Sequence, residues 1–187
     1  ARRCINCGMI SVNPHLTEEG LIKFYDGYFK ERTTNEGKLF EQRWKTYEID
    51  RKWLENFIEQ GKILDIGCSG GHFLSTFDSK KWDVMGVEIE KEAADFARKE
   101  YGIPVRVGKI TELELEERFD VIMMRGVIEH FSDPIQVLEK CTMLLKPGGY
   151  LFITATPAGD SFAFDVYREK WVLFTPISHI HFFTVNL

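Results

Sequence analysis

No hydrophobic run in the sequence is long enough for a membrane-spanning helix, because the longest apolar stretches have only the length of a strand. The net charge is −5, so no chain-wide positive field attracts nucleic acid. The four cysteines are too few and too scattered for the disulfide framework of a small secreted domain. These features predict a cytoplasmic protein with neither a membrane span nor a nucleic-acid partner.

The composition is 44% hydrophobic and 28% charged over 187 residues, which is enough for one globular core with a small appendage. We divide the chain into a cysteine-containing head (1–16), N-terminal helices (17–60) and an α/β core (61–187). The sequence begins with Ala and stops directly after a strand-like segment. We therefore expect a fragment of a longer protein, in which the final antiparallel strands of the sheet are missing from the core.

Two helices are predicted before residue 60. Thr17 is followed by two acidic residues, which is typical of a helix start. A second helix is expected over about 38–59, ended by Gly61. Tyr25, Tyr28 and Trp44 on these helices could form a lid over a cofactor, although amphipathic packing onto the core would give the same pattern.

From residue 62 onward, apolar strands alternate with helical patterns. The expected strands are 62–66, 83–88, 104–107, 119–124 and 149–154, and the expected helices are 71–78, 91–101 and 133–145. This order predicts a Rossmann-like, doubly wound and mainly parallel sheet with right-handed crossovers. Ligands of such sheets bind beyond the carboxyl ends of the strands, here at the turn 65–71, at Glu88 and at Arg125.

The stretch ILDIGCSGGHFL (63–74) describes a buried strand that enters a glycine turn and then a helix. It departs from the G-x-G-x-x-G fingerprint of dinucleotide sites. The carboxylate of Asp65 stands just before the turn, where it would repel a pyrophosphate but suit a positively charged cofactor such as S-adenosylmethionine. Glu88, after the second strand, can accept both ribose hydroxyls of either cofactor type. Its alternative role is a solvent-facing acid at a helix start.

Four motifs in order resemble those of class I S-adenosylmethionine-dependent methyltransferases: ILDIGCSGG, VMGVEIEKEAADFA, FDVIMMRGVIEHFSDP and LLKPGGYLFIT. The resemblance covers about 62–156. IEHFSDP and the distal W…P-I-S-H-I-H-F-F-T stretch are similar to the subgroup that methylates small molecules, including sugar, lipid and quinone-type intermediates.

The resemblance implies a set of cofactor contacts, position by position. It places Asp65, Gly67, Cys68 and Gly71 around the methionine part of S-adenosylmethionine. It assigns the ribose to Glu88, the adenine to Ile89 and backbone contacts near the amino-acid end to Arg125.

Two positions depart from the family pattern. Ser69 replaces the middle glycine of D-x-G-x-G-x-G, and we expect it to be tolerated if its φ is below zero. Lys109 stands where an acid that reads the adenine amino group is expected. A backbone carbonyl would have to replace that acid.

Methyl transfer to oxygen or carbon requires the removal of a proton from the acceptor, and histidine is a natural base for this step. His130 follows the fourth strand and is our candidate for the general base or acceptor positioner, with a purely structural role as the alternative. His179 and His181 differ by two, so a strand would place them on one side. With Trp171 they could line the acceptor pocket, or they could simply pack against neighbouring elements.

Cys4 and Cys7, followed by Gly8, resemble half of a zinc ribbon. A structural zinc site needs four ligands, so the other pair would have to lie upstream. We predict no stable zinc site in this chain and a complete one in a longer protein. A redox role is less favoured, because no thioredoxin-like unit surrounds the pair.

The sequence thus predicts an enzyme that uses S-adenosylmethionine to methylate an oxygen or carbon of a small-molecule acceptor. One alternative is a noncatalytic methyltransferase-like scaffold or regulator, which would keep the fold and lose turnover. The other is a nicotinamide-dependent oxidoreductase, which Asp65 and the broken dinucleotide fingerprint disfavour.

Overall fold

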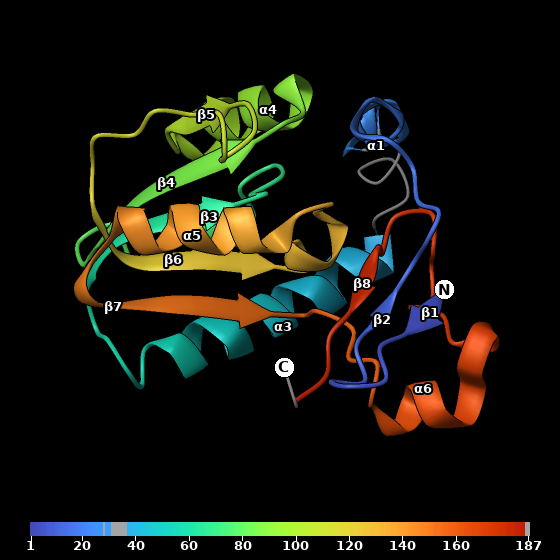
Figure 1. Cartoon of the computed structure of the whole chain (residues 1–187). Coiled ribbons are helices and arrows are strands. Elements are labelled where there is room, and N and C mark those ends of the chain that lie inside the picture. The colour runs from blue at the N-terminus through green and yellow to red at the C-terminus, as the bar shows by residue number, and fades with distance from the viewer. Residues whose placement is uncertain (28, 31–36, 186–187) are drawn as a thin grey trace.

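A computed structural model, which describes residues 1–27, 29–30 and 37–185, shows a five-stranded parallel sheet at the centre (Figure 1). Its spatial order is β5-β4-β3-β6-β7. The strands are β3 (Gly61–Ile66), β4 (Trp82–Glu88), β5 (Val105–Val107), β6 (Phe119–Arg125) and β7 (Leu145–Thr154). The chain runs outward from β3 to β5 and returns to pair β6 with β3, which creates a topological switch point between them. The predicted Rossmann-like fold is confirmed.

The central strands are buried on both faces, as their continuous apolar sequences predicted. In β6, Val121 and Met123 face one hydrophobic cluster, whereas Ile122 and Met124 face the other. All four side chains are 0% exposed. This period-two division is what a strand between two layers of helices requires.

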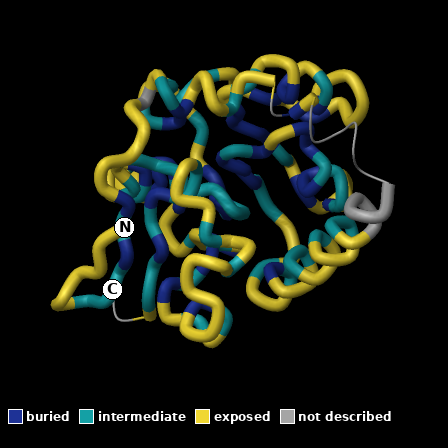
Figure 2. Tube along the Cα trace, turned by 90° about the vertical axis from the view of Figure 1, so that its right-hand side faces the viewer, coloured by how far each residue is buried: buried dark blue, intermediate teal, exposed yellow. Residues whose placement is uncertain are grey.

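Helices cover both faces of the sheet. The first cluster includes residues of α3 (Gly37–Leu54), of the 3-10 helix η1 (Leu74–Thr76) and of α4 (Lys91–Tyr101). The second includes residues of the 3-10 helix η2 (Ile128–His130) and of α5 (Pro134–Leu144). Figure 2, which looks onto the carboxyl ends of the strands, shows the buried segments enclosed by exposed ones. None of the helices in the described part of the chain could cross a membrane.

A second, small antiparallel sheet joins the two ends of the chain. It consists of β1 (Arg2–Arg3), β2 (Ile10–Ser11) and β8 (His181–Phe182). Beside it lie α6 (Phe162–Tyr167) and the 3-10 helix η3 (Arg168–Lys170). Figure 1 shows that this sheet and α1 (Glu18–Tyr25) stand opposite the carboxyl ends of the parallel strands.

The predicted helix starts at Thr17 and Asp133 are confirmed. Thr17 Oγ1 accepts a hydrogen bond from the backbone N–H of Gly20. The Asp133 carboxylate accepts from two amides in the first turn of α5. These side chains satisfy amide groups that have no partner within the helix.

The predicted helix over 71–78 is wrong. Only η1 forms there, because hydroxyls of Ser75 and Thr76 bind the carbonyls of residues 72 and 73 and compete with the helical pattern. The helix predicted over about 38–59 is longer than the observed one. The helix ends at Leu54 with i−3 bonds that tighten its last turn, and Gly61 opens β3 instead of ending α3. Tyr28 lies outside the described residues.

The small sheet is expected to depend on Phe182, which is 0% exposed and stacks on Phe174 with ring centroids 5.1 Å apart. We predict that Phe182→Ala lowers the free energy of unfolding by about 3–5 kcal/mol, because it removes a buried aromatic side chain and leaves a cavity. Phe162 is the matched control, because it is 84% exposed and its replacement should change stability by no more than about 0.5 kcal/mol. Equal losses in urea unfolding of the two variants would contradict the assignment.

Candidate functional site

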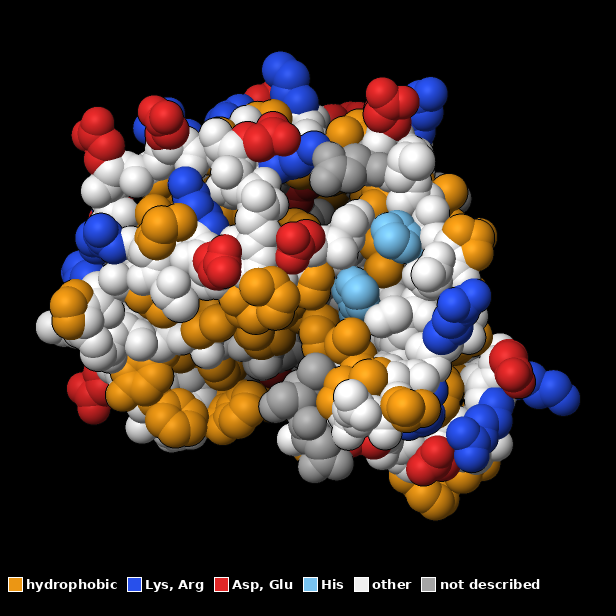
Figure 3. Space-filling view, viewed as in Figure 1, with side chains coloured by type: hydrophobic (Ala, Val, Ile, Leu, Met, Phe, Trp, Pro, Cys, Tyr) orange, Lys and Arg blue, Asp and Glu red, His pale blue; other side chains and the backbone are white. Residues whose placement is uncertain are grey.

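The three positions predicted to bind a cofactor come together at the carboxyl edge of the sheet. Asp65 lies near the end of β3, opposite Gly86 of β4 and Met123 of β6. Glu88 ends β4, and Arg125 ends β6. Figure 3 shows that the surface is hollowed between the parts of the molecule formed by α4 and α1.

The turn after β3 needs glycine at two positions. Gly67 has φ +72°, and a Cβ there would lie 2.7 Å from a methyl carbon of Val127. Gly71 has φ +76°, and its Cβ would lie 2.8 Å from the Cβ of Ala97. Both residues combine a left-handed backbone with close packing, so a side chain at either position would be strained and would clash.

The condition under which we expected Ser69 to be tolerated, a φ below zero, is not met, because its φ is +49°. A left-handed conformation costs a non-glycine residue about 1–2 kcal/mol. The backbone N–H of Ser69 donates to Glu88 Oε2 at 2.8 Å, and this bond to a carboxylate offsets the strain. Ser69 therefore keeps the turn shape that a glycine would adopt at this position.

Glu88 organises the turn and is not a solvent-facing acid, because it is only 9% exposed. Besides the bond from Ser69, its Oε1 accepts from the amides of Ile89 at 2.7 Å and of Glu90 at 3.0 Å. Burial raises the pKa of Glu88, and these three amides oppose the rise. Ile89 is 44% exposed and offers an apolar surface beside the carboxylate.

Asp65 is the least compensated charge at this edge. It is 3% exposed, and burial raises its pKa to about 8, with Arg125 opposing the rise and Glu88 adding to it. No hydrogen bond from the described residues offsets the burial. Arg125 is instead directed to α3, where its Nε donates to Asp50 at 2.7 Å and its guanidinium stacks 4.7 Å from the Tyr47 ring centroid. A bound cationic ligand would supply the positive partner that the Asp65 carboxylate lacks.

Cys68 and Lys109 both make contacts within the protein. Cys68 is 5% exposed, and burial raises the pKa of its thiol well above the usual value. Its backbone N–H donates to the Val87 carbonyl, so it holds the turn against β4. Lys109, which replaces the expected acid, forms an ion pair with Glu112 at 3.1 Å.

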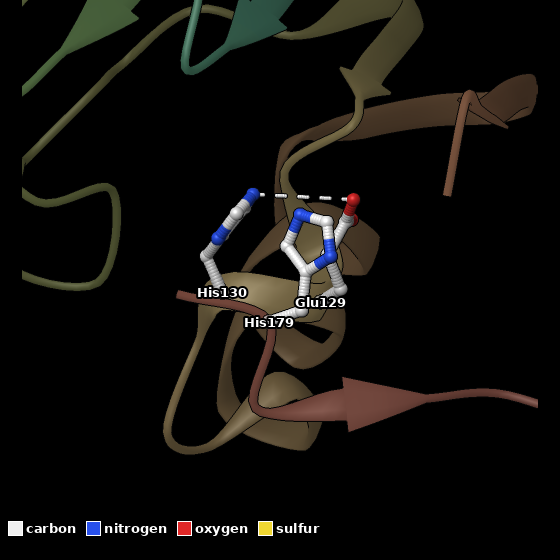
Figure 4. A group of neighbouring side chains, drawn as sticks. All are labelled: Glu129, His130 and His179. Atoms are coloured by element: carbon white, nitrogen blue, oxygen red, sulfur yellow. Dashed lines mark ion pairs between the residues drawn. The ribbon is translucent and has the colours of Figure 1, made fainter. Parts of the chain in front are cut away.

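The histidine predicted to act on the acceptor lies in η2. His130 Nδ1 is 2.8 Å from the Ser178 carbonyl oxygen and 2.7 Å from the Tyr25 hydroxyl oxygen. The ring of His179 lies 4.8 Å from the His130 ring, centroid to centroid. The structure thus brings His179 to His130, as Figure 4 shows.

Glu129 completes this group, and we did not predict it. Its side chain is 1% exposed, its Oε2 accepts from the Thr156 hydroxyl at 3.1 Å, and burial raises its pKa to about 7. Its Oε1 lies 3.9 Å from His130 Nε2. The signal in the sequence was its place directly before His130, just beyond a buried strand.

The other predicted acceptor residues have different neighbours. His181 Nδ1 lies 3.1 Å from the Ser11 hydroxyl, and β8 begins at His181, so the alternation of a strand does not extend back to His179. Trp171 packs with Phe164 at a centroid distance of 6.0 Å, in the small cluster beside β2 and β8.

The cysteines of the head lie in the turn between β1 and β2. The Gly8 amide donates to the Cys4 carbonyl, and hydrogen bonds from Cys7 and Asn6 lower the pKa of the Cys4 thiol. In the described part of the chain, no third histidine, cysteine or acidic residue joins Cys4 and Cys7 in a metal-binding group.

Comparison with known proteins identifies the family. A family profile described as a methyltransferase domain matches residues 41–186, so the chain belongs to this family. A ubiquinone biosynthesis O-methyltransferase from Paraburkholderia phymatum is 32% identical over 131 residues, covering 65% of this chain and 56% of the relative. The enzyme of the same name from Cereibacter sphaeroides is 32% identical, with 67% and 54% covered. The chain thus spans about half the length of these curated relatives.

Solved structures agree with this assignment. An S-adenosylmethionine-dependent methyltransferase from Thermotoga maritima superimposes with a TM-score of 0.62 at 26% identity, covering 84% of this chain and 74% of that chain. The sugar N-methyltransferase KedS8 from Streptoalloteichus has a TM-score of 0.55 at 21% identity, with 62% and 49% covered, and shares the fold.

The raised pKa of Asp65 makes a testable prediction about stability. Between the unfolded value of about 4 and the folded value of about 8, the folded state binds the extra proton, so the free energy of unfolding should fall as pH rises. Asp65→Asn removes this dependence. Urea unfolding at pH 5, 7 and 9 should therefore show a stability gain over the unsubstituted chain that grows with pH, whereas a gain independent of pH would contradict the assignment.

Proposed function

We propose that the chain binds S-adenosylmethionine at the carboxyl edge of the sheet and transfers its methyl group to a small-molecule acceptor. The observation that carries the proposal is the buried, uncompensated carboxylate of Asp65. The cofactor carries an ammonium and a sulfonium and no phosphate, so its charge complements Asp65. A nicotinamide dinucleotide would bring its pyrophosphate toward the same carboxylate.

We assign the remaining cofactor contacts to residues of the turn and of the two strand ends beside it. Gly67 and Gly71, with their left-handed backbones packed on Val127 and Ala97, would give the turn the shape that receives the methionine part. Glu88 lies at the end of β4, in the position where the ribose hydroxyls of a bound nucleoside can donate to it. The exposed face of Ile89 would cover the adenine. Lys109 stands where an acid was expected and is paired with Glu112. Backbone groups after β5 would therefore bind the adenine amino group.

We also propose that the N-terminal helical segment covers the cofactor. Phe29 is 7% exposed, and its backbone N–H donates to the Glu90 carboxylate at 3.1 Å. Its ring lies so close to Gly70 that a Cβ there would be 2.6 Å from it. Tyr25 contacts His130 from the same segment. Such a cover would exclude water from the transferred methyl group.

The acceptor is proposed to be a hydroxyl-bearing small molecule, of the phenolic or quinone-precursor type. Relatives named as O-methyltransferases of ubiquinone biosynthesis support an oxygen acceptor. Methyl transfer leaves a neutral thioether, so the enzyme's tasks are to position the acceptor and to assist loss of its proton. His130 is assigned to the acceptor side of the site.

For the head, we propose that Cys4 and Cys7 supply half of a structural zinc site. The lowered pKa of Cys4 favours the thiolate form that zinc requires. Two further ligands are needed, and a longer chain or a partner would have to provide them.

Cofactor binding is tested by thermal and chemical unfolding with S-adenosylmethionine, S-adenosylhomocysteine and NAD. A ligand at about 100 times its dissociation constant should add about 2.7 kcal/mol to stability. We expect this gain with the first two ligands and none with NAD. Glu88→Ala should abolish most of it, whereas Glu92→Ala, at an exposed position in the first turn of α4, should retain it. A gain with NAD alone would refute the proposal.

The role of His130 is tested with labelled methyl groups and a panel of phenols, sugars and quinone precursors. On an accepted substrate, His130→Gln should lower kcat by about 100-fold or more, because the acceptor proton is no longer removed efficiently. Its affinity for S-adenosylhomocysteine should stay the same. His15→Gln, at an exposed position, is the control. Full turnover by His130→Gln would exclude a role on the acceptor side.

A further inference from the structure

Three donor atoms converge beside the proposed acceptor site. Glu129, His130 and His179 each offer one ligand atom, and these atoms all lie within 4.8 Å of one another. Figure 4 shows the two imidazole rings turned toward the Glu129 carboxylate. The residues come from η2 and from the segment before β8, so the tertiary fold assembles the group.

Backbone carbonyls favour the same tautomer in both histidines. His130 Nδ1 lies 2.8 Å from the Ser178 oxygen, and His179 Nδ1 lies 2.8 Å from the Leu173 oxygen. A carbonyl oxygen can only accept, and the Tyr25 hydroxyl 2.7 Å from His130 Nδ1 can accept as well as donate, so a hydrogen on each Nδ1 satisfies these contacts. In the neutral imidazoles Nε2 is then the acceptor, and the dashed line in Figure 4 joins His130 Nε2 to Glu129. Metal-binding histidines are held in the same way by their second nitrogen.

Glu129 provides a carboxylate oxygen in the same place. Its Oε2 is occupied by the Thr156 hydroxyl, whereas its Oε1 faces His130 Nε2 at 3.9 Å. The side chain is 1% exposed. A buried carboxylate oxygen and two imidazole nitrogens gathered at this spacing are donor types that suit a divalent cation.

We propose that Glu129, His130 and His179 bind a divalent transition-metal ion of the zinc class. Two imidazoles and one carboxylate are a known ligand set for catalytic metal sites, in which a further position is left for water or substrate. Metal–ligand distances near 2.0–2.1 Å in a tetrahedral site place donors about 3.3 Å apart. Rotations of the three side chains that move the donors by about 1 Å would reach this geometry.

The catalytic consequence rests on the proposed methyl transfer, whereas metal binding does not. The hydroxyl oxygen of the acceptor takes the open position, and its proton leaves to solvent. The oxygen lone pair then attacks the methyl carbon. The carbon–sulfur bond breaks, and its electron pair stays on sulfur as the neutral thioether. With a metal bound, His130 would act as a ligand in place of the general base, and the ion would stabilise the oxygen anion.

The test is titration with Co²⁺, followed by its visible absorption, and competition with Zn²⁺. The full chain carries Cys4→Ser and Cys7→Ser, so that the head cannot contribute a thiolate site. We expect one Co²⁺ per chain, displaced by Zn²⁺. Loss of a residue that only hydrogen-bonds to a metal ligand lowers metal affinity by about 10–100-fold. Loss of a ligand itself should cost more, so His179→Ala and Glu129→Gln should each weaken binding by more than about 100-fold.

Two controls make the result decisive. His15→Ala removes an exposed histidine that does not belong to the group and should leave the affinity unchanged. Stabilisation by S-adenosylhomocysteine, measured with and without metal, shows that each variant is folded and that the cofactor site works separately. Absence of Co²⁺ binding, or binding equally strong in the His179 and Glu129 variants, would overturn the metal proposal. Loss of cofactor binding alone would instead overturn the proposed function.

Discussion

The site depends on a buried carboxylate, Asp65, near the end of the central strand β3. Its burial is unavoidable, because β4 and β6 flank β3 and helices cover both faces of the sheet. Arg125, the cation that could have neutralised it, is bound by Asp50 and stacked on Tyr47. With a pKa of about 8, Asp65 holds its proton at neutral pH in the empty site, and the proposed cationic cofactor would favour the ionised form.

Glu88 sets the second constraint, through the number of hydrogen bonds that it can accept. An ionised carboxylate offers about four lone-pair sites, and the amides of Ser69, Ile89 and Glu90 occupy three of them. In the proposed complex, one ribose hydroxyl could be added directly, whereas a second would require one amide to give way. The amide of Ser69 is our candidate, because a residue with a left-handed backbone has strain to lose if it moves.

The sequence predicted the sheet well because period-two burial and the order of the strands are local signals. The same order locates Asp65 and Glu88, since the carboxyl ends of parallel strands share one edge. The features that the sequence did not predict depend on tertiary contacts. The backbone of Ser69 follows from a bond to a residue 19 positions away, and the contact between His130 and His179 joins segments about 50 residues apart. No periodicity in the sequence encodes either contact.

The small sheet and the acceptor side of the site share one segment of chain. Backbone hydrogen bonds run from Val12 to Ile180 and from Ile180 to Glu129, each 2.8 Å long. The carbonyl that contacts His130 Nδ1 belongs to Ser178, two residues earlier. The head thus holds the C-terminal segment in place, and that segment in turn holds the histidines. A change in the head that displaced residues 178–182 would therefore disturb the acceptor side while leaving the cofactor turn, which belongs to the parallel sheet, intact.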